Sequence, residues 1–125
     1  MVPSQLVQEV EELRREAYAI DLIEGDGWAN LIFHDYRIPP GYNRASIELL
    51  LKFPMSYPNG RPDMFWTDKE LLLANGAAPR NADAIEPALG KEWRRFSWHP
   101  TNWNPGRDNL RTYLEFVNNR LAKTV

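Results

Sequence analysis

The chain of 125 residues contains no cysteine at all. A sequence without cysteine has no disulfide, no thiolate metal ligand and no sulfur nucleophile. Histidine is scarce too, because only His34 and His99 are present. Two imidazoles form a metal site only when carboxylates join them, and no ligand spacing in the sequence indicates such a site. We therefore expect neither a metal ion nor another cofactor.

Long apolar runs and an excess of one charge are also missing. No apolar stretch approaches the roughly 18 residues that a membrane-spanning helix needs. The first ~16 residues carry too many charges for a signal peptide. The net charge is −2, whereas nucleic-acid-binding domains usually carry a basic excess. We therefore expect a cytoplasmic protein that binds neither membranes nor nucleic acids.

The overall composition is that of an ordinary folded protein. Hydrophobic residues make up 43% and charged residues 26% of the chain, which is typical of globular domains. The length fits one domain rather than two, and neither an internal repeat nor a linker interrupts it. We therefore predict a single domain over residues 1–125.

Two segments have the apolar spacing of amphipathic helices. Residues 4–17 follow Ser4 as the expected N-cap and place one stripe on the helix, formed by Leu6, Val10, Leu13 and Ala17. Residues 106–123 follow Pro105, a residue favoured at a first helical turn, and their stripe is formed by Leu110, Leu114, Val117 and Leu121.

Four short segments between these helices have the pattern of strands, at residues 18–24, 28–37, 45–53 and 64–66. The clearest alternation places Ile47, Leu49, Leu51 and Phe53 on one face of residues 45–53. We predict a four-stranded antiparallel meander with both helices on that face, and His34 facing solvent. Residues 68–92 are interrupted by proline and glycine, which predicts a long irregular crossover.

Three prolines follow the clearest strand, in the stretch Phe53-Pro54-Met-Ser-Tyr57-Pro58-Asn-Gly-Arg-Pro62. Proline fixes φ and removes a backbone donor, so this spacing predicts an extended turn held against the sheet. We expect a structural role for Pro54, Tyr57, Pro58 and Pro62.

The order of these elements and motifs resembles the ubiquitin-conjugating-enzyme (UBC) fold, an α+β fold. The Phe-Pro, Tyr-Pro and further proline match the hallmark of that fold, and Trp103-Asn-Pro105 is similar to its tryptophan-X-proline step. The chain most resembles the prokaryotic ubiquitin-conjugating-enzyme-like family E. The stretches that carry this likeness are Pro39-Pro-Gly-Tyr-Asn43, Pro62-Asp-Met-Phe65, Trp93-X-X-Phe-Ser-Trp-His99 and Trp103-X-Pro-Gly-Arg-Asp108.

The resemblance implies a bacterial ubiquitin-like conjugation pathway, with a ubiquitin-like protein and a ubiquitin-activating-like enzyme as partners. Catalytic relatives hold a cysteine several residues before the tryptophan-X-proline step, and this chain has Ser97 and His99 in that region instead. The usual His-Pro-Asn motif is not recognisable either. The chain is then either a pseudoenzyme that binds or scaffolds its partners, or an active conjugating enzyme whose cysteine was replaced, with Ser97 as the natural candidate.

One region combines the side chains expected of a partner-binding surface, since tryptophans anchor interfaces and arginines recognise carboxylates. Its members are Trp93, Arg94, Arg95, Trp98, His99, Trp103 and Arg107. The alternative for the three tryptophans, which we favour, is a small core beneath a loop.

Two further alternatives remain open. Ser97 and His99 could serve a transferase or hydrolase as nucleophile and base, which would require a third group to orient the imidazole. An interaction module like the RWD domain is the other alternative, although the tryptophan-X-proline step argues against it.

Overall fold

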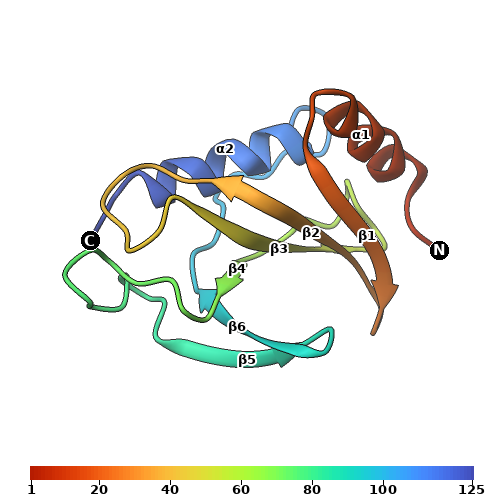
Figure 1. Ribbon diagram of the computed structural model, residues 1–125. Helices are drawn as coiled ribbons and strands as arrows, with labels where there is room; N and C mark the ends of the chain where they lie inside the picture. Colours follow the sequence, from red (N-terminus) through yellow and green to blue (C-terminus); the bar gives the residue numbers. More distant parts are fainter.

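The computed structural model describes residues 1–125 and has the predicted α+β architecture, with one helix near each end of the chain and an antiparallel sheet between them (Figure 1). In chain order the elements are α1 (Ser4–Arg15), β1 (Ala19–Gly25), β2 (Trp28–Arg37), β3 (Ser46–Pro54), β4 (Phe65–Asp68), β5 (Ala84–Ala88), β6 (Lys91–Phe96) and α2 (Leu110–Leu121). The sheet has six strands rather than the four predicted.

The strands follow the order β1-β2-β3-β4-β6-β5, and every neighbouring pair is antiparallel. The predicted meander is therefore present as β1 to β4. It is extended by a hairpin that lies largely within the segment predicted to be irregular. Leu89 and Gly90 form its two-residue turn with φ angles of 50° and 81°, and such turns need two positive φ values. Pro87 is tolerated because β5 is an edge strand.

The first helix starts and ends differently from the prediction. Pro3 is the N-cap rather than Ser4, and no side chain caps the first turn. Ala17, predicted as part of the apolar stripe, lies beyond the helix with a φ of 78°. The amide of Ala17 donates to Arg14 O at 3.1 Å and that of Tyr18 to Leu13 O at 3.1 Å, which is the Schellman pattern of helix termination.

The second helix is shorter than the predicted range 106–123 because a capping box fixes its start. The Asn109 side chain accepts from the amide of Thr112 at 3.0 Å, and the Thr112 hydroxyl oxygen accepts from the amide of Asn109 at 2.9 Å. Pro105 therefore precedes the helix and lies in the loop before it. Neither helix is long and apolar enough to cross a membrane.

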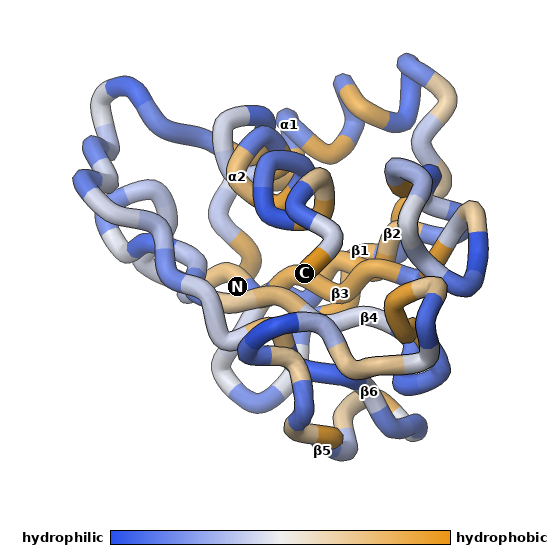
Figure 2. The backbone as a smooth tube through the Cα atoms, turned by 90° about the vertical axis from the view of Figure 1, so that its left-hand side faces the viewer, coloured by the Kyte–Doolittle hydropathy of each residue, from blue (hydrophilic) through white to orange (hydrophobic).

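Both helices cover the same face of the sheet, as predicted (Figures 1 and 2). Leu49, Leu51 and Phe53 of β3 are fully buried there, and Ile47 is 2% exposed. One continuous apolar cluster joins them to the buried stripes of the two helices, formed by Leu6, Val10 and Leu13 of α1 and by Leu110, Tyr113, Leu114, Val117 and Leu121 of α2.

The opposite face of the sheet carries no helix and is covered by its own long side chains. Leu50, Trp66 and Trp93 form a second, smaller apolar cluster there. The ammonium groups of Lys52 and Lys91 lie 4.9 Å and 4.1 Å from the ring centres of Trp66 and Trp93. In these cation–π contacts the lysine side chains cover the two indole rings, and their ammonium groups keep the surface of this face charged.

His34 lies on that same face and joins three strands instead of facing solvent freely. Its Nε2 is 2.8 Å from Asp21 Oδ2 of β1, and its Nδ1 is 2.8 Å from Glu48 Oε1 of β3. The hydrogen bond to Asp21, followed by that to Glu48, raises the pKa of His34 above its ordinary value. The imidazolium therefore bridges two carboxylates across the first three strands.

Truncating the buried face of β3 should destabilise the fold strongly. We expect Leu49→Ala to lower the free energy of unfolding by about 2–5 kcal/mol, because the side chain is fully buried and leaves a cavity. Urea unfolding monitored by circular dichroism measures this loss. Glu12→Ala on the exposed side of α1 is the control, and a Leu49→Ala loss no larger than that of the control would contradict this packing.

The His34 bridge should make stability depend on pH with a definite sign. The pKa of His34 in the folded state is raised above the unfolded value of about 6.5. The bridge therefore contributes its full stabilisation of the folded state below that value, and this stabilisation is lost as the pH rises through the folded-state pKa. We expect the difference in unfolding free energy between the wild type and His34→Gln to shrink from about pH 5.5 to about pH 8.5. Urea titrations across this range measure it, and a constant difference would refute the bridge.

Candidate functional site

The loop of residues 97–108 connects β6 to the cap of α2 and is fastened to the proline-rich turn of residues 54–64. Arg61 Nη1 donates to Pro100 O at 2.8 Å, and Trp103 Nε1 donates to Pro58 O at 2.8 Å. His99 Nδ1 lies 2.6 Å from Asp63 Oδ1. Three separate contacts therefore hold one loop against another, so its side chains have defined positions.

The turn that receives the loop is itself packed into the core. Tyr57 is 3% exposed, and its ring lies 5.0 Å from Phe53 and 6.3 Å from Trp103. Its hydroxyl donates to Glu9 of α1 at 2.5 Å. Burial raises the pKa of Tyr57, so the phenol stays protonated. The Tyr57–Pro58 peptide bond is cis, and Pro62 is buried.

A groove lies between this loop and α2. It is lined by His99, Pro100, Thr101, Trp103, Asp108, Thr112, Tyr113 and Phe116. Its aromatic floor is formed by Tyr113, whose ring centre lies 5.3 Å from that of Phe116 and 6.5 Å from that of Trp103. The Tyr113 hydroxyl donates to Met64 O, and burial raises its pKa, so the floor carries no charge.

The rim of the groove carries fixed charges. The amide of Asn104 donates to Asp108 Oδ2 at 2.7 Å and holds the pKa of Asp108 below its usual value. Arg107 Nη2 lies 3.5 Å from the same carboxylate and remains 67% exposed. His99 is also largely exposed. An extended chain lying in the groove would meet aromatic rings below and both signs of charge at the edge.

The three predicted tryptophans do not form one wall. Trp93 is 1% exposed and lies on the helix-free face of the sheet, where its Nε1 donates to Ala88 O at 2.9 Å. Trp98 is partly buried beside the last turn of α2, with the guanidinium of Arg120 3.8 Å from its ring centre. Only Trp103 lines the groove. Burial in a small apolar cluster therefore describes Trp93, and Trp98 and Trp103 are partly buried against the main core.

The three predicted arginines are also separated. Arg94 is 9% exposed, and its guanidinium donates to the carbonyls of Ala82 and Lys69; burial lowers its pKa. Arg95 lies on the helix-free face, paired with Glu86 at 2.7 Å. Of the residues of the predicted surface, only His99, Trp103 and Arg107 therefore lie at or beside the groove.

Ser97 and His99 do not form a nucleophile and base. The Ser97 hydroxyl accepts a hydrogen bond from Arg95 Nε at 3.0 Å, and no hydrogen bond joins it to His99. A guanidinium cannot accept a proton, so it cannot activate the hydroxyl as a base would. The geometry thus provides no support for the transferase or hydrolase alternative based on these two residues. No group of three or more histidine or carboxylate side chains is arranged to hold a metal ion.

Sequence reasoning missed Asp63 and six residues that line the groove, which are Pro100, Thr101, Asp108, Thr112, Tyr113 and Phe116. Asp63 shows why. It orients the His99 imidazole from 36 positions away in the chain. Its only local signal was its place after Pro62 in the turn. A pairing at this distance depends on the packing of two loops, which no local pattern in the sequence reports.

Comparisons with known proteins agree with the likeness that the sequence carries. The family model described as prokaryotic E2 family E matches residues 6–124, which is nearly the whole chain. No curated protein and no solved structure matches the chain.

The indole of Trp103 offers a direct test of how the loop is fastened. We expect Trp103→Phe to lower the free energy of unfolding by about 0.5–1.5 kcal/mol, because the ring packing survives while the bond to Pro58 O is lost. We also expect faster amide hydrogen exchange in residues 98–104 and unchanged exchange in β2 and β3. The matched control is Trp28→Phe, because Trp28 is a partly exposed tryptophan at the start of β2, beside the turn between β1 and β2. Unaltered exchange in the loop of Trp103→Phe would contradict this fastening.

Proposed function

This chain belongs to the prokaryotic E2 family E, and we propose from that membership that it serves a ubiquitin-like conjugation pathway as a binding partner and not as a thioester carrier. The E2-like family implies contact with ubiquitin-like proteins or their activating enzymes in general. A conjugating enzyme carries its cargo on a cysteine thiolate, and no cysteine is present. The proposed role is that of a pseudoenzyme that binds or scaffolds its partners.

The observation that carries this proposal is a groove beside a loop without a cysteine. The loop of residues 97–108 is tied to the proline-rich turn by Arg61, Asp63 and Trp103. The groove is lined by aromatic and polar side chains. These features support a groove that holds an extended tail without bonding to it covalently, since the chain has no thiol.

The chemistry of the groove suits an extended, flexible tail of a ubiquitin-like protein. Tyr113 and Trp103 offer flat apolar surface to backbone and small side chains. Arg107 is exposed at the rim and can pair with a carboxylate of the tail or of the activating enzyme. His99 is held in one orientation by Asp63, so binding does not have to order that side chain.

The absence of a thiol leads to a clear biochemical expectation. When the chain is incubated with the ubiquitin-like protein and activating enzyme of its pathway and ATP, we expect no adduct sensitive to reductant. Gel electrophoresis with and without reductant checks this. A hydroxide-sensitive adduct that disappears in Ser97→Ala would contradict the proposal, since it would identify Ser97 as an ester-forming replacement for a cysteine.

Binding at the groove can be tested with variants that leave the core untouched. We expect Arg107→Ala and His99→Ala each to weaken binding of the ubiquitin-like protein or activating enzyme by about 1–2 kcal/mol, as interface anchors do. Isothermal titration calorimetry measures the change. Glu12→Ala on α1 is the control and should bind normally. Normal binding by both groove variants would show that partners use another surface.

A further inference from the structure

The groove between the loop and α2 leads beyond the side chains that line it. Phe116 of α2 lines the groove, and Arg120 follows it four positions later in the same helix. Residues four apart lie on the same side of a helix, so Arg120 continues the side of α2 that faces the groove. On the facing loop, Trp98 directly precedes His99, which also lines the groove. The groove therefore leads to the pair formed by Trp98 and Arg120.

Trp98 holds two arginines at this end of the groove. Its ring centre lies 3.8 Å from the guanidinium of Arg120, in a cation–π contact. Its Nε1 donates to Arg80 O at 3.0 Å. The amide of Arg80 donates in turn to Val125 O at 2.9 Å, so the segment around Arg80 lies beside the C-terminal end of α2 (Figure 1). Two basic residues from distant parts of the chain therefore flank one indole.

The positive charges of these two arginines are not balanced within the chain. Arg80 and Arg120 take part in none of the ion pairs of the structure, with Val125 or with any acidic side chain. Nη2 of Arg120 is buried without a hydrogen-bond partner, whereas most buried polar atoms in folded proteins are paired. Burial lowers the pKa of Arg120, and the positive charge of Arg80 adds to this effect. An anion at this end of the groove would balance both charges.

The charges elsewhere in the groove are already paired. At the opposite end, Arg107 Nη2 lies 3.5 Å from Asp108 Oδ2, and the pKa of Asp108 is held below its usual value by the amide of Asn104. In between, His99 Nδ1 lies 2.6 Å from Asp63 Oδ1. A carboxylate would meet another carboxylate at each of these positions. Electrostatic complementarity therefore directs a negative group to the end formed by the two unpaired arginines.

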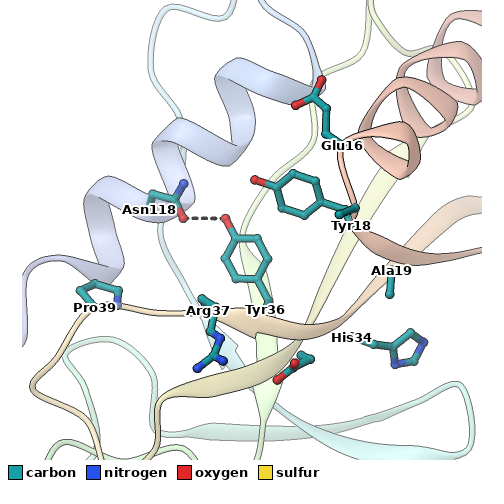
Figure 3. Close-up of a pocket in the computed structure, with 10 residues that line it drawn as sticks. Glu16, Tyr18, Ala19, His34, Tyr36, Arg37, Pro39 and Asn118 are labelled. Atoms are coloured by element: carbon teal, nitrogen blue, oxygen red, sulfur yellow. Dashed lines mark hydrogen bonds between the residues drawn. The ribbon is translucent and has the colours of Figure 1, made fainter.

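The pocket on the other side of α2 offers an anion no comparable place. Figure 3 shows Asn118 of α2 turned toward Tyr36, whose hydroxyl donates to it at 2.6 Å. Asn118 and Arg120 are two positions apart, so they lie on different sides of the helix. The pocket beside Asn118 is lined by the carboxylates of Glu16 and Asp35 together with a single arginine. Both carboxylates would oppose a further negative charge.

We propose that Arg80 and Arg120 bind the C-terminal carboxylate of the tail that lies in the groove. This inference rests on the proposed function and adds where the tail ends and which group recognises its end. Guanidinium groups bind carboxylates through charge-assisted hydrogen bonds, and Trp98 holds both arginines in place. The chain would thus recognise a tail with a free terminus and would not retain one whose terminus is already joined through an amide bond.

The length of the groove fits the last few residues of such a tail. Thr112 lines the groove near the start of α2, and Arg120 lies in the last turn of the helix. At a rise of about 1.5 Å per residue these positions are about 12 Å apart along the helix axis. An extended chain rises about 3.3 Å per residue, so about four residues cover this distance.

The probe is an array of random peptides of about eight residues, each attached through its N-terminus so that it ends in a free carboxylate. The same peptides ending in a primary amide are the reference, because the two sets differ only in the terminal charge. Fluorescence anisotropy then gives the Kd of the strongest pairs in solution. We expect the carboxylate peptides to bind at least roughly tenfold more tightly than their amides, as hydrogen bonds to charged groups allow.

Arg120→Gln and Arg80→Gln each remove one guanidinium, and we expect each to lower this ratio of affinities at least roughly threefold. Arg80 is exposed, so Arg80→Gln tests the proposal even where Arg120→Gln disturbs the packing on Trp98. The control is Arg15→Gln on α1, which removes the same charge from an exposed arginine without an ion pair and should leave the ratio unchanged.

Equal binding of carboxylate and amide peptides would overturn the inference, and so would a ratio that neither arginine variant changes. His99→Ala separates this inference from the proposed function. If His99→Ala weakens carboxylate and amide peptides that bind the wild type equally, the groove holds a tail whose end lies elsewhere, and only the carboxylate site is wrong. If no peptide binds, or if binding is insensitive to His99→Ala, the groove itself is not the binding surface and both proposals fail.

Discussion

The helix-facing side chains of β3 are buried completely, and the positions of the other elements follow from the need to cover them. Burial of the apolar side chains of Leu49, Leu51 and Phe53 stabilises the fold by about 25 cal/mol for each Å² removed from water. Complete burial requires both helices to lie on this face of the sheet. α1 and α2 provide matching apolar stripes. The other face then needs no second layer, because lysine side chains over Trp66 and Trp93 cover it.

The same packing places the candidate site. The proline-rich turn leaves β3 at Pro54 and is drawn to the core through Tyr57, which contacts both Phe53 and Glu9 of α1. α2 enters the core through Tyr113, whose hydroxyl donates to Met64 O at the far end of that turn. The loop of residues 97–108 lies between two elements that are already fixed, so three contacts suffice to define its groove. The shape of the groove therefore does not depend on a nucleophile in the loop.

Local patterns in the sequence predicted the helices and strands whose structure is set by residues close together in the chain. The period-two alternation of β3 and the helical spacing of Leu6, Val10 and Leu13 indicated the central strand and first helix correctly. The sequence analysis missed β5 and β6 for two reasons. Leu89 occupies a turn position with positive φ, which usually holds glycine or asparagine. Arg94 occupies a buried strand position, where backbone carbonyl groups accept hydrogen bonds from its charged guanidinium. The Asp63–His99 contact and the bulge before Tyr36 depend on pairing between distant segments, for which the sequence holds no local signal.

The unequal lengths of β1 and β2 also bear on self-assembly. A ladder between two identical chains needs strands long enough to offset the entropy lost on association, and typical strands have about 5–6 residues. Beyond the pair Ala19–His34 only Asp35–Arg37 of β2 lack β1 as a neighbour, and Asp35 has a φ of 51°, which is not extended backbone. The chain also turns between α1 and β1 beside this end of β2, at Ala17. This end of the sheet therefore gives a second copy no continuous run of strand along which to pair.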